Sequence, residues 1–70
     1  MIPLSFLPVG SEMTVKALGG KPEVKRHLES LGFSNGTTVV VTSVISGNVI
    51  VKVKESRIAI SQEMARKIMV

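Results

Sequence analysis

Two side chains of this sequence have the spacing of a metal-binding pair. Glu23 and His27 lie four residues apart in a segment with a helical pattern, so both would project from one face of a helix. A carboxylate and an imidazole both bind transition metals, but metal sites usually provide at least three protein ligands, and no third ligand is evident. The spacing is better explained by a hydrogen bond or ion pair on an exposed helix, and a metal on Glu23 and His27 is the less favoured alternative.

Other residues that could carry chemistry are few. The chain has one His and no Cys, which excludes a thiol nucleophile, a disulfide scaffold and a zinc ribbon. The pair Gly19-Gly20 precedes the helical segment, but its spacing matches neither of the glycine-rich phosphate-binding motifs, and a turn explains it better. We therefore predict that the protein is not an enzyme and holds no cofactor.

The charge balance is mildly basic. Nine Lys and Arg against five Glu give a net charge of +4, which favours anionic partners without choosing among them. The basic residues that could form one patch are Lys25, Arg26, Lys52, Lys54 and Arg57. Because Phe6 and Phe33 are the only aromatic residues, the stacking platforms of single-strand binders are missing. Nucleic acid is therefore not the expected partner, and binding it through a basic face is kept as an alternative.

The length of 70 residues allows one domain, which we place at residues 1–70. A hydrophobic fraction of 44% is enough for a dense small core. No apolar run approaches the roughly 20 residues that span a bilayer, and the first residues lack the basic start of a secretory signal. We expect a chain that is not itself inserted in a membrane.

The periodicity predicts a mainly β fold with short elements. Alternation and β-branched residues indicate strands, and the apolar stripe of Val24, Leu28 and Leu31 indicates one helix. In chain order we expect a helical turn within 1–9, strand 12–18, a helix from Pro22 capped by Gly32, strands 37–45, 49–54 and 57–60, a helical turn that Ser61 caps, and a closing strand 68–70. These elements predict a small antiparallel β-barrel of about five strands, with a short helix between the first two and a short C-terminal helical turn.

The strand at 37–45 has apolar residues on both faces. Alternation places Val39 and Val41 toward the core, which turns the intervening side chains outward unless a bulge resets the register. The outward candidates are Val40, Thr42, Val44 and, from the next strand, Ile50. Such an apolar surface is typical of a partner-binding site. The alternative is that the N-terminal segment or the helix covers it.

The order of these signals resembles the FeoA family. The resemblance rests on the Leu-x-x-Leu-Gly-(apolar)-x-x-Gly run from Leu28 to Gly36, on Ile58-Ala59-Ile60 and on Ala65, and it extends over essentially the whole chain. It implies an SH3-like barrel with a helical insertion. The layout is also similar to the SH3-like C-terminal domain of iron-dependent repressors. Their DNA-binding and dimerisation region is absent from this sequence, so we expect a stand-alone protein and keep a repressor-type regulatory domain as an alternative.

The resemblance implies a non-enzymatic accessory protein of bacterial ferrous iron transport and iron homeostasis. Its expected partner is the membrane ferrous iron permease FeoB, which has a cytoplasmic GTPase region. We expect a cytoplasmic protein that this partner recruits to the inner face of the membrane and that regulates or assembles the transporter. Weak self-association and direct binding of a transition metal are left open. The helix face with Lys25, Arg26 and His27 and the outward strand residues are the predicted contacts.

Overall fold

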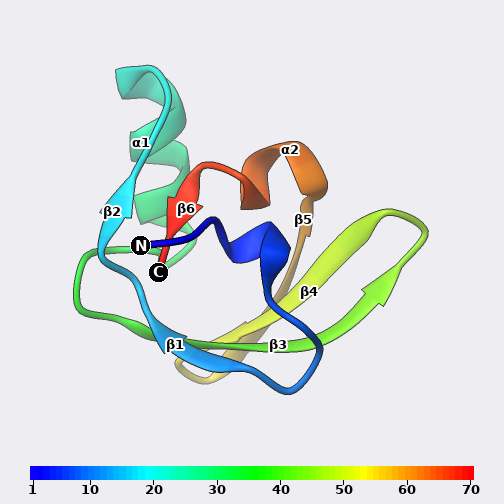
Figure 1. The fold of residues 1–70 in the computed structure, drawn as a ribbon. Helices are drawn as coiled ribbons and strands as arrows, with labels where there is room; N and C mark the ends of the chain where they lie inside the picture. The colour runs from blue at the N-terminus through cyan, green and yellow to red at the C-terminus, as the bar shows by residue number, and fades with distance from the viewer.

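The computed structural model describes all 70 residues as two antiparallel sheets, with the helices on one side of the larger sheet (Figure 1). The larger sheet has the order β1-β3-β4-β5, formed by Glu12–Thr14, Thr38–Ile45, Asn48–Val53 and Ser56–Ser61. The smaller sheet pairs β2 (Ala17–Leu18) with β6 (Ile68–Met69). The helical elements are η1 (Leu4–Phe6), α1 (Pro22–Ser30) and α2 (Gln62–Ala65). The predicted fold class, mainly β and antiparallel with one short helix and a C-terminal helical turn, is confirmed.

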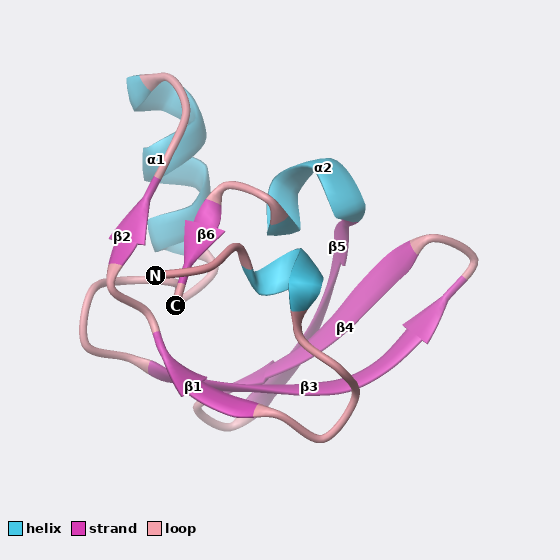
Figure 2. Cartoon of the chain, in the orientation of Figure 1, coloured by secondary structure: helices cyan, strands magenta, loops and turns pink.

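The structure has six strands where we expected about five. The predicted strand 12–18 divides because neighbouring residues bond to different sheets. The Val15 N–H donates to the Thr37 carbonyl at 2.9 Å, whereas the Lys16 N–H donates to the Met69 carbonyl at 2.8 Å. The chain therefore leaves the larger sheet after β1 and joins the smaller one as β2 (Figure 2), and α1 lies between the second and third strands.

One core lies between the two sheets and the helices. Its thirteen members are all apolar, and no polar residue is buried. The strand β4 contributes Val49, Val51 and Val53, which face inward at every second position, as the pleat of a strand requires. The remaining buried residues are Leu4, Val15, Leu28, Phe33, Val39, Val41, Ile60, Ala65, Ile68 and Val70.

The helix α1 begins and ends as its residues predict. Pro22 occupies the first turn, where its missing N–H is no loss. At the other end Gly32 has a φ of +106°, its N–H donates to the Glu29 carbonyl, and the Phe33 N–H donates to the Leu28 carbonyl, both at 3.0 Å. These two bonds form a Schellman motif, which brings Phe33 back onto Leu28. The predicted Gly32 cap is confirmed.

The ends of the chain and its last helix are also fixed by hydrogen bonds. Ile2 and Val70 exchange two backbone bonds, of 3.0 and 2.9 Å, so the termini lie side by side (Figure 1). The Ser61 hydroxyl accepts the Met64 N–H at 3.1 Å, which confirms the predicted cap of α2. No helix in this structure combines the length and the apolar character that crossing a bilayer would need.

Candidate protein-docking surfaces

The predicted helix residues lie on α1 but do not share one face. Lys25, Arg26 and His27 are all exposed. Because successive residues of a helix are about 100° apart, Lys25 and His27 lie on opposite flanks and Arg26 points away from the core between them. Leu28, on the remaining side, is buried. A partner that binds α1 would therefore meet Arg26 together with one flank.

The two flanks of α1 have different surroundings. Lys25 and Glu29 border a surface hollow of about 540 Å³, whose other walls are Ala17 and Leu18 of β2 and Ser34 and Asn35 of the following loop. On the opposite flank lie Glu23 and His27, one turn apart and both exposed. No group of three His, Asp or Glu side chains is assembled anywhere in the molecule, so the structure adds no third ligand to this pair.

The predicted strand patch is divided by a β-bulge. The pairing of β3 with β4 shifts between Val41 and Ser43, which leaves Thr42 as the extra residue, and its hydroxyl donates to the Ile50 carbonyl at 3.1 Å. Beyond the shift Val44 pairs with the buried Val49 and so lies on the inner face. Simple alternation, which placed Val44 outward, is therefore wrong for this residue, although Val44 is 49% exposed because it lies near the tip of the hairpin.

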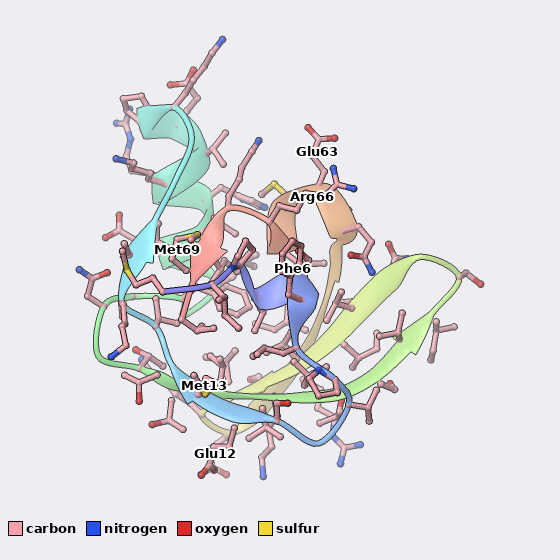
Figure 3. The ribbon with its side chains drawn as sticks, viewed as in Figure 1. Phe6, Glu12, Met13, Glu63, Arg66 and Met69 are labelled. Carbon is pink, nitrogen blue, oxygen red and sulfur yellow. The ribbon has the colours of Figure 1, made fainter.

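Val40 and Ile50 remain on the outer face of the larger sheet. No helix covers this face, and both side chains are partly buried by their neighbours in the sheet. The cross-strand partners of Val40 are Glu12 on β1 and Lys52 on β4. Figure 3 shows Glu12 pointing away from the body of the molecule on this side. The outer sheet face, which we define as Val40, Ile50, Lys52, Arg57 and Ala59, is thus an apolar strip bordered by charges.

Five exposed large apolar side chains were not among the predicted contacts, and two of them, Met1 and Ile2, lie at the start of the chain. Phe6, Val9 and Ile45 are 72%, 59% and 58% exposed. Phe6 projects from η1 on the side of the molecule where α2 presents Glu63 and Arg66 (Figure 3). The sequence contained one indication that Phe6 is exposed, because a short helical turn between Pro3 and Pro8 can bury few of its side chains. In the structure Leu4 is the buried residue of this turn.

This architecture defines the class of protein as a small SH3-like domain, a barrel of short antiparallel strands with a helical insertion. Comparison with known proteins then gives the family: the FeoA domain matches residues 2–70. An archaeal protein of Methanocaldococcus jannaschii, provisionally named Fe(2+) transport protein A, is 37% identical over 70 residues, which are 100% of this chain and 85% of that protein. The chain belongs to the FeoA family, whose members are non-enzymatic accessory proteins of ferrous iron transport.

Solved structures agree with this assignment. The crystal structure of an iron uptake regulatory protein, FeoA, superposes with a TM-score of 0.92 at 30% identity and covers 99% of this chain and 92% of its own. The zinc-complexed FeoA of Stenotrophomonas maltophilia, described as a prokaryotic SH3 domain protein, has a TM-score of 0.87 at 24% identity and covers 100% of this chain and 89% of its own. At that identity the second structure supports the fold alone.

Proposed function

We propose that this protein is a docking module that binds the cytoplasmic GTPase-containing region of a FeoB-type ferrous iron permease and regulates or assembles the transporter. The observation that carries the proposal is membership of the FeoA family over residues 2–70, together with a relative named for Fe(2+) transport. In this proposal the protein works in the cytoplasm, and the permease recruits it to the inner face of the membrane.

The exposed surfaces support a binding role. The outer sheet face has aliphatic side chains that no other part of the chain covers, and the exposed face of α1 carries basic groups. The one ion pair of the molecule joins Lys67 to Glu63 at 3.9 Å, and the basic groups of α1 and of the outer sheet face form none. Aliphatic area with free cations beside it is suited to a protein surface that presents both apolar and acidic residues.

The direct test is an amide NMR titration of this protein with the soluble GTPase region of the permease, in GDP and in a GTP analogue. We expect localised shifts on α1 or on the outer sheet face. An affinity that falls only modestly as salt is raised would indicate that the apolar contacts dominate, whereas a steep fall would indicate that ion pairs with acidic residues of the GTPase region dominate. No shift in either nucleotide state would contradict the proposal.

A single substitution tests the outer sheet face. Val40→Glu places a carboxylate on the outer sheet face and should lower affinity for the GTPase region by about tenfold or more, because burying a carboxylate against an apolar partner surface is costly. Thr38→Glu is the matched control, since Thr38 is exposed on the same face and strand, two residues away. Equal affinities for the two folded variants would remove Val40 from the contact surface.

A further inference from the structure

The strand β5 is an open edge of the larger sheet. It is the last strand in the order β1-β3-β4-β5 and pairs with β4 alone. Figure 2 shows it running from the β4–β5 turn to α2. Arg57 and Ala59 are exposed, whereas Ile60 is buried. An exposed edge of six residues is long enough to template the addition of another strand.

The register shows which backbone groups of β5 are free. A two-residue turn joins β4 to β5, and the pair that closes such a turn, Val53 with Ser56, exchanges hydrogen bonds. Because bonded and non-bonded pairs alternate along an antiparallel ladder, Ile58 and Ile60 also bond to β4, and the N–H and C=O groups of Arg57 and Ala59 point away from it. No turn, loop or side-chain bond in the structure uses these groups.

A surface hollow of about 580 Å³ lies beside this edge. Glu29, Leu31 and Gly32 at the end of α1 form one wall, and Val53, Arg57 and Ile58 of the β4–β5 hairpin form the other. The two walls come closest where α1 ends. A Cβ on Gly32 would lie only 3.0 Å from Cγ1 of Val53. An added strand would pack its inward side chains against the partly buried Leu31 and Ile58.

The charges at this edge indicate the chemistry of the added strand. Lys52 and Arg57 are direct cross-strand partners, a like-charge pair that is unfavourable by itself. Neither is ion-paired. A strand added to β5 would place a residue directly opposite Arg57, and an acidic side chain there would relieve the repulsion. A second copy of β5 does not provide one, because its outward residues are Arg57, Ala59 and Ser61.

We propose that the free edge of β5 takes up an extended segment of the partner protein as an additional antiparallel strand. The segment would have an acidic residue opposite Arg57 and aliphatic residues that face the hollow beside α1. Backbone bonds to Arg57 and Ala59 would supply affinity, and the acidic and aliphatic positions would supply specificity. This inference rests on the proposed function, because it specifies how the permease region is bound.

The other edge of the larger sheet offers a matched control. On β1 the Ser11 carbonyl accepts the Val41 N–H and the Val15 N–H donates to the Thr37 carbonyl, so alternation leaves the Thr14 N–H pointing outward. Proline is tolerated where a strand N–H faces solvent. Ala59→Pro therefore removes one donor from the β5 edge, and Thr14→Pro removes one from the β1 edge, and each keeps the bonds within the sheet.

The experiment measures binding of the GTPase region of the permease to the wild type, Ala59→Pro, Thr14→Pro and Arg57→Glu by calorimetry. We expect Ala59→Pro and Arg57→Glu to weaken binding by about tenfold, and Thr14→Pro to stay within about twofold. Amide hydrogen exchange gives a second readout that needs no variant. The Arg57 and Ala59 amides should exchange quickly in the free protein and at least about tenfold more slowly in the complex.

The outcomes separate this inference from the proposed function. If the wild type binds tightly but its Arg57 and Ala59 amides stay unprotected, strand addition at the β5 edge is wrong, and the docking function still holds. Absence of wild-type binding in GDP and in the GTP analogue would overturn the docking function and this inference with it. If Ala59→Pro fails to fold, the amide exchange of the wild type still decides the matter, because Arg57 also belongs to the outer sheet face and Arg57→Glu would weaken docking on that face too.

Discussion

The two phenylalanines of this protein have opposite environments. Phe33 is completely buried, and Phe6 is 72% exposed. Phe33 follows the helix α1, which is capped by Gly32, whose positive φ turns the chain back onto Leu28. The element that contains Phe6 is a single turn whose buried position is already taken by Leu4. The path of the local backbone, and not the residue type, therefore decides whether each phenylalanine is buried.

This comparison separates a region that stabilises the fold from a region available for contacts. Around Phe33 the end of α1 closes over the sheet, and every large apolar side chain there is at least partly buried. Around η1 and the β3–β4 hairpin tip, Phe6, Val9, Val44 and Ile45 remain exposed. Substitutions in the first region should lower stability, and substitutions in the second should leave it unchanged.

The largest effect is expected for Phe33→Ala. Removal of a fully buried aromatic ring leaves a cavity between α1 and the sheet, and we expect a loss of about 3–5 kcal/mol in the free energy of unfolding. Urea denaturation followed by circular dichroism measures it. For a 70-residue domain this is a large share of the total stability. A loss below about 1 kcal/mol would show that the packing around α1 can relax.

An intermediate effect is expected for Gly32→Ala. The φ of +106° is unfavourable for a residue with a Cβ, and the new methyl group would lie 3.0 Å from Cγ1 of Val53. We expect a loss of about 1–2 kcal/mol, measured by the same denaturation. Gly47→Ala, in the β3–β4 turn at φ +80° with no atom within 4 Å, isolates the backbone strain from the steric contact. An equal loss for both variants would mean that the contact with Val53 contributes nothing.

The smallest effect is expected for Phe6→Ala. It makes the same chemical change as Phe33→Ala at an exposed position, so the free energy of unfolding should change by no more than about 0.5 kcal/mol. Thermal and urea unfolding measured side by side with Phe33→Ala provide the comparison. A loss near that of Phe33→Ala would mean that the two regions are not distinct.

Much of this fold could be predicted from the sequence, because several of its signals are local. Gly32 and Ser61 identified the end of α1 and the start of α2, and alternation identified Val39 and Val41 as inward residues of β3. The candidate contacts were less predictable. Lys25 and His27 lie on opposite flanks of α1, and Val44 lies on the opposite face of the sheet from Val40 and Ile50.

The sequence by itself determined the class of fold, the family and the core valines, since turn chemistry and side-chain periodicity depend on neighbouring residues. Only the tertiary structure decided where the first predicted strand divides, because Val15 and Lys16 bond to partners distant in sequence. The bulge at Thr42 and the free edge of β5 have the same origin. Register and edges are properties of pairs of strands, and no single segment contains the information that sets them.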